Sequence, residues 1–356
     1  MINETVGYYN GEFKISNHIV KSFDIVPNSF EDMIQMNETN IIKVHLFDIQ
    51  SDTMHNDAHI LEMTNFIKNE AFLIVFGGWI PCTFIKQNTI LLADRNIVSE
   101  IIRRYKDGIK KVKEEFDSLD YIFLNHNLNV MLDITAYVIE GNERKIPTNS
   151  MIDQQIAIVK RDIKSALPNL KIATYPNGNA YYHDLKNLLK PIIENRILFL
   201  QEIVPSLNKQ FTEKTRENAV DMVFEIATKI ELKKNDIVVL LALLRILMKG
   251  NKTAAQLVLK DSQRYSEESA YNAAFDLTTI EILINLYYYH EKNTNHNIAL
   301  ITQDKGLSLF SSLFNKTKIS SRSEGKIQVA ANILFSVFND DEALAKKYEE
   351  WLKGEV

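Results

Sequence analysis

The stretch Thr89-Ile90-Leu91-Leu92-Ala93-Asp94-Arg95-Asn96 decides the fold class of this chain. Its first five residues form a continuous apolar run, which is typical of a strand buried on both faces. From Ile97 to Lys113 the apolar residues recur at helical spacing. A strand that leads through a short polar turn into a helix is the beginning of a parallel α/β unit.

The same order of elements returns near the end of the chain. Ile298-Ala299-Leu300-Ile301-Thr302 is a second apolar strand, and Gln303-Asp304 leads from it into another apolar helix. The carboxyl ends of neighbouring parallel strands border one crevice, where ligands bind. We therefore expect Asp94 and Asp304 to point into one cleft.

Helical patterns fill most of the chain between these strands. We expect helices at 130–140, 149–167, 180–200, 205–230, 235–249, 252–260 and 269–291. A βαβ crossover needs only a dozen or so residues. Residues 143–268 are therefore predicted to be a helical insertion that shapes substrate access, or that mediates self-association or binding of a protein partner.

The remaining segments flank the predicted core, which comprises 87–142 and 269–322. Residues 1–86 are predicted to be an α/β extension with strands at 41–47 and 71–76 and a helix at 58–69. A weak strand is expected at 317–320, and residues 323–356 are assigned to C-terminal helices, beginning at Gln328. The predicted fold class is α/β, with a parallel sheet flanked by helices.

Composition excludes several classes of protein. The chain has 356 residues, a net charge of −5 and no block of basic residues, which argues against a broad non-specific nucleic-acid surface. Its single cysteine, Cys82, can form neither an internal disulfide nor a thiolate metal site. The most apolar runs, 71–80 and 236–248, are too short or too interrupted for a membrane span. We expect a cytoplasmic protein without a membrane segment.

Two further acids lie on predicted apolar helices, where exposure to water does not explain them. Glu140 ends one helix before Gly141, and Asp276 lies within another. Together with Asp94 and Asp304 they would form a group of carboxylates that repel one another. A hard divalent cation relieves such repulsion, and ligation by oxygen alone suits Mg²⁺ or Mn²⁺.

The combination Asp94-x-Asn96, Glu140, Asp276 and Thr302-x-Asp304 resembles the PIN-domain ribonucleases. The resemblance covers roughly residues 88–142 and 269–322. It implies a PIN-like sheet and an endoribonuclease in which the four acids hold one or two Mg²⁺ or Mn²⁺ ions. It also implies that Asn96 and Thr302 position waters or phosphate oxygens, and that cleavage of RNA leaves 5′-phosphate and 3′-hydroxyl ends.

Each of these residues also has a structural interpretation. An acid or amide that precedes a helix often caps it, and here Asn96 is favoured over Asp94 as the cap. Asp304 could be a turn residue before Gly306, and Glu143 competes with Glu140 as the ligand. Two other functions stay open: a PIN-like binding or regulatory module without catalysis, and a structure-selective DNA nuclease.

Three weaker patterns complete the list of candidates. Arg103 and Arg104 would contact a phosphate backbone, or else lie on a solvated helix face. The run Tyr287-Tyr288-Tyr289-His290 would stack on bases, or else pack internally. His55 and His59 have the spacing of a zinc pair on a helix, but no acidic partner lies between them.

Overall fold

The computed structural model describes the backbone of 67–68, 70–75, 78–248, 253–260, 264–311 and 341–353, and of the strands at 6–9, 12–15, 18–26, 41–50, 59–64, 318–323 and 326–330. For those separate strands only the backbone is described. Within the described residues, no helix is both long enough and apolar enough to cross a membrane.

A six-stranded sheet forms the centre of the α/β part. Its order is β12 (Lys171–Ile172), β11 (Met131–Asp133), β8 (Thr89–Ala93), β13 (Asn297–Thr302), β6 (Phe72–Val75) and β7 (Gly78–Pro81). The first four strands are parallel, whereas β6 runs antiparallel to both β13 and β7. The sheet is therefore mixed, and the prediction of a parallel sheet is wrong at this edge. Strands β6 and β7 are neighbours along the chain and pair in register, with Val75 opposite Gly78.

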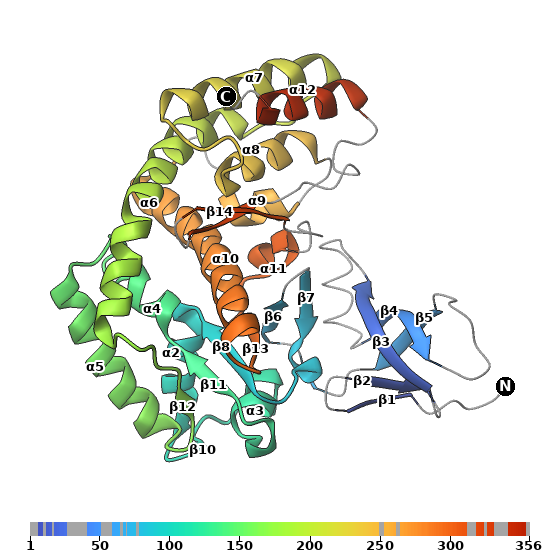
Figure 1. Cartoon of the computed structure of the whole chain (residues 1–356), viewed down its shortest axis with the longest axis vertical. Coiled ribbons are helices and arrows are strands. Elements are labelled where there is room, and N and C mark those ends of the chain that lie inside the picture. Colours follow the sequence, from blue (N-terminus) through green and yellow to red (C-terminus); the bar gives the residue numbers. More distant parts are fainter. Residues whose placement is uncertain are drawn as a thin grey trace.

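The order of the strands creates a switch point between β8 and β13. From β8 the chain moves outward through β11 to β12, and it later returns to β13 on the other side of β8 (Figure 1). Ala93 pairs with Ile301, so the carboxyl ends of β8 and β13 lie side by side. In open α/β sheets, ligands bind outside the strand ends at such a point.

Helices cover both faces of this sheet. Successive side chains of each strand point to opposite faces, so a hydrophobic core forms on each face. Leu91 and Ala93 pack with apolar residues of α2 (Arg95–Arg104), α3 (Ser118–Phe123) and α5 (Asn149–Ala166). Ile90 and Leu92 pack in the other core, to which α6 (Asn179–Leu207), α10 (Glu267–Asn293) and α11 (Lys305–Ser311) contribute. Short helices α4 (Thr135–Glu140), η1 (Cys82–Phe84) and η2 (His126–Leu128) connect these elements.

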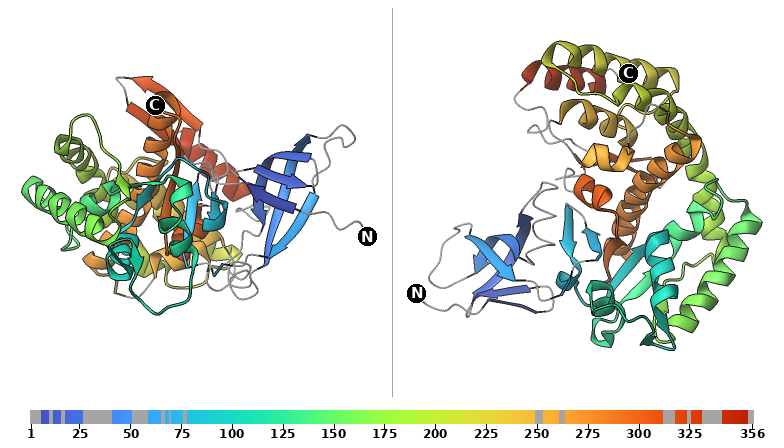
Figure 2. Two further views of the ribbon diagram at one scale, coloured as in Figure 1. Left: turned by 90° about the horizontal axis from the view of Figure 1, so that it is seen from below. Right: turned by 180° about the vertical axis from the view of Figure 1, so that it is seen from behind.

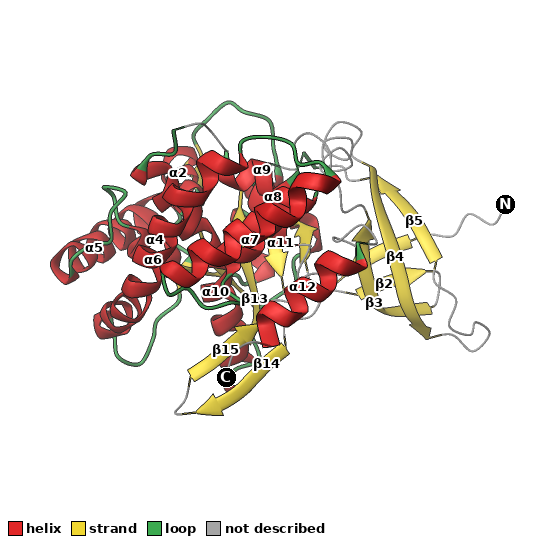
Figure 3. Cartoon of the chain, turned by 90° about the horizontal axis from the view of Figure 1, so that it is seen from above, coloured by secondary structure: helices red, strands yellow, loops and turns green. Residues whose placement is uncertain are grey.

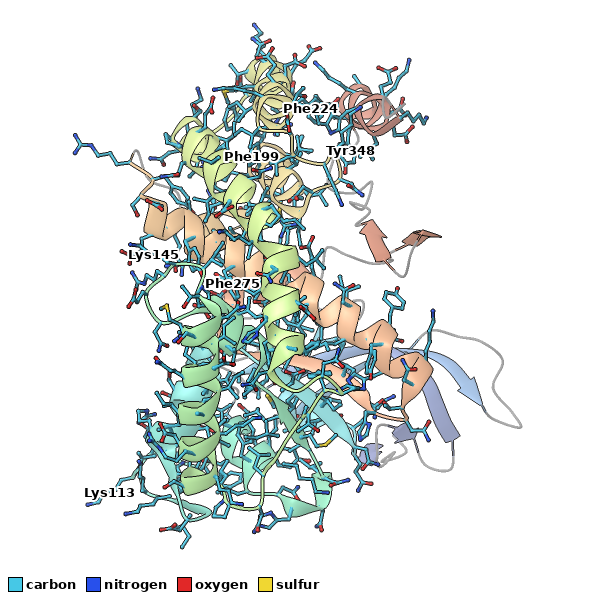
Figure 4. All side chains as sticks on the ribbon, turned by 60° about the vertical axis from the view of Figure 1, so that its left-hand side comes forward. Lys113, Lys145, Phe199, Phe224, Phe275 and Tyr348 are labelled. Atoms are coloured by element: carbon cyan, nitrogen blue, oxygen red, sulfur yellow. The ribbon has the colours of Figure 1, made fainter. Side chains whose placement is uncertain are left out.

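Two long helices connect the sheet to a group of helices at the other end of the molecule. Helices α6 and α10 lead from the sheet toward α7 (Glu213–Lys229), α8 (Ile237–Leu247), α9 (Ala254–Leu259) and α12 (Glu342–Lys353), as Figure 2 shows from behind. In Figure 4, α6 passes across α10, which carries Phe275. Every residue of α8 is buried, and Trp351 of α12 stacks on Phe224 of α7 with ring centroids 4.2 Å apart. The helices predicted here are confirmed, but two boundaries differ: α6 continues to Leu207 instead of ending at residue 200, and α7 begins at Glu213 instead of residue 205.

A separate five-stranded antiparallel sheet comprises β1 (Val6–Tyr9), β2 (Glu12–Ile15), β3 (His18–Val26), β4 (Ile41–Gln50) and β5 (His59–Thr64), and is visible in Figure 3. The strand at 41–47 is confirmed. The prediction of a helix at 58–69 is wrong, because residues 59–64 form strand β5. His59 thus lies on a strand, which removes the helical spacing of the zinc pair, and His55 lies outside the described residues. The strand at 71–76 is confirmed, but it joins the six-stranded sheet.

Smaller differences concern where elements end. Helix α2 stops at Arg104, and the chain forms a hairpin of β9 (Tyr105–Lys106) and β10 (Ile109–Lys110). Asp107 and Gly108 both have positive φ, the backbone that a two-residue hairpin turn requires. Near the C-terminus, β14 (Lys318–Ser323) confirms the weak strand, but β15 (Lys326–Ala330) replaces the start of the helix expected from Gln328. Residues 331–340 lie outside the described residues.

Candidate functional site

Asp94 lies directly after β8 and begins helix α2. Its Oδ1 accepts a hydrogen bond from the backbone N–H of Ile97 at 2.8 Å, so Asp94 is the N-cap of the helix. The expectation that Asn96 would be the cap is wrong, because the helix begins at Arg95 and not after Asn96. Asn96 is exposed on the first turn.

Thr302, at the end of β13, joins the two acid-bearing turns. Its buried hydroxyl donates to Asp94 Oδ2 at 2.6 Å and accepts the backbone N–H of Asp304 at 3.0 Å. Asp304 Oδ1 in turn accepts the N–H of Leu307 at 2.7 Å and so caps α11. Thr302 therefore fixes the position of Asp94 relative to Asp304, although 208 residues separate Thr302 from Asp94.

Gly306 has a different role from the turn that the sequence suggested. It lies inside α11, where an added Cβ would come within 2.8 Å of Leu257 Cβ on α9. The glycine therefore permits close packing of α11 on α9. The interpretation of Asp304 as a turn residue before Gly306 is wrong, since Asp304 is a helix cap.

Glu140 ends α4, and two side chains from other helices hold this end. Gly141 follows with a φ of +74°, which stops the helix. Arg95 donates to the carbonyl oxygens of Gly141 and Tyr137, and its Nε lies 3.5 Å from Glu140 Oε2. The hydroxyl of Tyr271 on α10 donates to the carbonyl oxygen of Glu140. Carbonyl groups that α4 leaves unpaired are thus satisfied from α2 and α10. Glu143 is exposed.

Asp276 brings α10 into the same group of acids. Burial raises the pKa of Asp276 well above its usual range, and the charges of Asp304, Glu140 and Asp94 raise it further. Lys260 opposes this effect. The four expected acids are thus close enough to act on one another. We call Asp94, Glu140, Asp276 and Asp304 the acid site.

Two other members of the acid site also have raised pKa values. Burial raises the pKa of Asp94 to about 6; hydrogen bonds from Thr302 and Ile97 oppose this shift, and the charge of Asp304 adds to it. Burial raises the pKa of Glu140 to about 7 against the opposing charge of Arg95. The protein environment therefore disfavours the ionised carboxylate forms of Asp94 and Glu140.

The chemical type of the ligands in the acid site suits a divalent cation. Carboxylate oxygens are the ligands that Mg²⁺ and Mn²⁺ prefer, and a cation would lower the repulsion that raises the pKa of Asp276. Among the described residues, however, no three His, Cys, Asp or Glu side chains are grouped closely enough to hold one ion. This arrangement differs from a cage of three or four carboxylates. Mg²⁺ commonly takes only one or two carboxylates and keeps several waters.

The two arginines considered for phosphate contact are already engaged by acids. Arg103 hydrogen-bonds Glu100 and Glu114, and it is half-exposed. Arg104 is buried, and it contacts Asp117 and Glu100. A phosphate would have to displace these carboxylates, so the geometry favours a structural role for both arginines.

Three residues with a part in this region were missed from sequence. Arg95 and Tyr271 hold the end of α4, but hydrogen bonds to distant carbonyl groups leave no pattern in a sequence. Asp133 ends β11 and is fully buried, and it accepts hydrogen bonds from Tyr175 and from the N–H of Thr135. Asp133 has the same sequence pattern as Asp94, namely an acid at the end of an apolar strand. It was hidden because 130–140 was assigned to one helix.

No protein-family model matches the chain, and neither a curated protein nor a solved structure resembles it closely enough to count as a match.

Proposed function

We propose that this protein is a divalent-metal-dependent endonuclease that cleaves RNA and leaves 5′-phosphate and 3′-hydroxyl ends. The observation that carries the proposal is the joining of two acid-bearing strand ends at the switch point of the sheet, where the Thr302 hydroxyl donates to Asp94 and accepts the N–H of Asp304. The charges of Asp304, Glu140 and Asp94 also raise the pKa of Asp276. The positions of Asp94, Thr302 and Asp304 at the ends of β8 and β13 agree with the PIN-domain resemblance. In this proposal, strands β8, β11, β12 and β13 form the PIN-like core.

The acid site would hold Mg²⁺ or Mn²⁺, with Asp94 and Asp304 as the central ligands and Asp276 and Glu140 at its sides. When bound, such an ion polarises a phosphate and lowers the pKa of a water. The protein supplies the rest. Thr302 keeps both strand-end carboxylates in place, and its hydrogen bonds leave each of these acids with oxygen lone pairs for a ligand.

Arg95 has a second effect on the proposed site. Its charge partly neutralises Glu140 and thereby favours the carboxylate form that a cation requires. Because Arg95 also donates to the carbonyl of Gly141, it holds Glu140 at the edge of the crevice. Asn96, exposed on the same turn, is free to contact water or a phosphate oxygen.

A second candidate is a PIN-like binding module without catalysis. The absence of three grouped ligand side chains among the described residues favours it. Both candidates place a cation at the acid site, but only the nuclease turns over its substrate.

The test is incubation of the purified protein with 5′-labelled single-stranded RNA, double-stranded RNA and single-stranded DNA, each with Mn²⁺, Mg²⁺ or EDTA. The proposal expects cleavage of RNA that requires the metal and that leaves ends accessible to a 5′-phosphate-dependent exonuclease. RNA that stays intact at every metal concentration, while Mn²⁺ still raises the melting temperature, would favour the binding module. Cleavage of DNA alone would instead indicate a DNA nuclease.

A further inference from the structure

A continuous series of ring contacts joins four segments of the chain. Neighbouring centroids are 5.1, 4.0, 6.4, 5.0 and 6.2 Å apart along the series. We call this series the aromatic row; in spatial order it consists of Tyr182, Tyr181, Tyr175, Tyr289, His290 and His296. Its members come from the start of α6, the loop before it, the end of α10 and the turn before β13.

The aromatic row is both rigid and partly open to solvent. Tyr181 stacks on Tyr175 with an interplanar angle of 21°, and the hydroxyl of Tyr175 donates to the buried carboxylate of Asp133. Tyr182 and His290 are the buried members of the aromatic row. Tyr289 is 41% exposed, whereas Tyr175 and Tyr181 are half-buried. Rings that are fixed in this way lose little further freedom when a flat ligand stacks on them.

The aromatic row is connected to the acid site through the fold. Asp133, which holds Tyr175, pairs in the sheet with Leu92, two residues before Asp94. Along α10, Tyr289 lies 13 residues after Asp276, which is about 20 Å at the helical rise. A polymer bound at the acid site could therefore reach the aromatic row with a few of its units.

We propose that the aromatic row stacks against unpaired nucleobases of a single-stranded RNA, an inference that rests on the proposed function and names its substrate class. Unpaired bases expose π faces that aromatic side chains can stack on, whereas bases inside a duplex do not. Stacking is also a suitable source of affinity here, because it needs no basic surface and the chain carries a net charge of −5. A double-stranded substrate would need the basic surface that this composition lacks.

The test measures binding in EDTA, so that hydrolysis plays no part. Fluorescence anisotropy would compare a labelled 12-nucleotide RNA with an abasic sugar-phosphate strand of equal length and with an RNA duplex. We expect the single strand to bind most tightly and Tyr289→Ala to weaken its binding about tenfold. Tyr289→Phe keeps the ring and should bind like the wild type. Leu198→Ala, at a side chain of α6 that is 55% exposed, is the matched control.

Equal binding by Tyr289→Ala and the wild type, or equal binding of the abasic strand, would overturn the inference. Tightest binding of the duplex would overturn it as well. These outcomes are separate from the fate of the nuclease proposal. Binding that depends on Tyr289, without cleavage in Mn²⁺, would keep the stacking surface and reject hydrolysis. Cleavage without any effect of Tyr289→Ala on binding would do the reverse.

Discussion

Helix α10 takes part in two groups of carboxylates that differ in how their charge is balanced. Glu281 and Asp236 both contact the guanidinium of Arg196, at 2.7 and 2.9 Å, and Arg196 is only 2% exposed. Five residues earlier on the same helix, Asp276 faces other acids, and its pKa is raised. We call Arg196, Asp236 and Glu281 the Arg196 cluster.

The difference separates carboxylates that contact a buried cation of the protein from the carboxylates of the acid site, for which we propose a metal ion as the partner. In the Arg196 cluster one buried guanidinium hydrogen-bonds both acids directly and ties α6 to α8 and α10. In the acid site, Arg95 and Lys260 oppose the acidic charge only in part, and the pKa values of Asp94 and Glu140 stay raised. Imbalance of charge inside a fold costs stability, so acids of this kind at the ends of strands are candidates for a functional site.

The largest effect on stability is expected when Arg196 is removed from the Arg196 cluster. Arg196→Met leaves Asp236 and Glu281 without their buried partner, and we expect a loss of about 3–5 kcal/mol in the free energy of unfolding. Urea denaturation measures it. Lys190→Met on the same helix, at a half-exposed pair with Glu194, should change stability by less than about 1 kcal/mol. Similar values for both variants would contradict the structural role of the cluster.

The next effect concerns catalysis at the acid site. Asp94→Asn and Asp304→Asn should each lower RNA cleavage by about a hundredfold or more, because each removes a charge that would bind the metal. Both variants should stay folded, since asparagine also caps helices. Asp153→Asn, an exposed acid on α5, is the control and should cleave like the wild type. Wild-type turnover in either site variant would reject the assignment.

A related substitution decides between two glutamates. Glu140 lies in the acid site, whereas Glu143 is exposed. We expect Glu140→Gln to reduce cleavage and Glu143→Gln to leave it unchanged, as measured by initial rates under saturating Mn²⁺. The opposite pattern would transfer the role to Glu143.

The effect of Mn²⁺ on the melting temperature tests whether Asp304 binds a metal ion. An ion that binds only the folded state should stabilise the wild type by about 2.7 kcal/mol at a hundredfold excess over Kd. Asp304→Asn removes one repelling charge, so we expect a higher melting temperature in EDTA and a smaller rise with Mn²⁺. Thermal melts of both proteins under both conditions measure this. Equal Mn²⁺-induced shifts would show that Asp304 is not a ligand.

A further expected effect is the dependence of stability on pH. Asp94 and Glu140 have pKa values of about 6 and 7 in the fold, above the values of about 4 in an unfolded chain. Their contribution to stability is therefore complete below about pH 4, and it is lost as pH rises through 6 and 7. In EDTA, the melting temperature should fall between pH 5.5 and 8, and Glu140→Gln should reduce this fall. An identical slope in the variant would contradict the raised pKa of Glu140.

Much of this architecture was predictable because it depends on local patterns. Strands β8 and β13 are apolar runs followed by polar turns, and the longer helices have sustained periodicity, which makes both easy to recognise. Strands β11 and β12 were missed because three and two residues are too few for a periodic signal. Missing β11 also hid Asp133.

The sequence by itself identified the four members of the acid site: Asp94 and Asp304 after apolar strands, and Glu140 and Asp276 on helices. The tertiary structure alone decided which of these groups are neighbours and how their charges are balanced. Strand order places Thr302 against Asp94 across 208 residues, and side-chain packing pairs Arg104 with Asp117 while it leaves Asp276 among acids. The physical reason is that propensity acts within a few residues along the chain. Electrostatic balance depends on distances that only the folded chain sets.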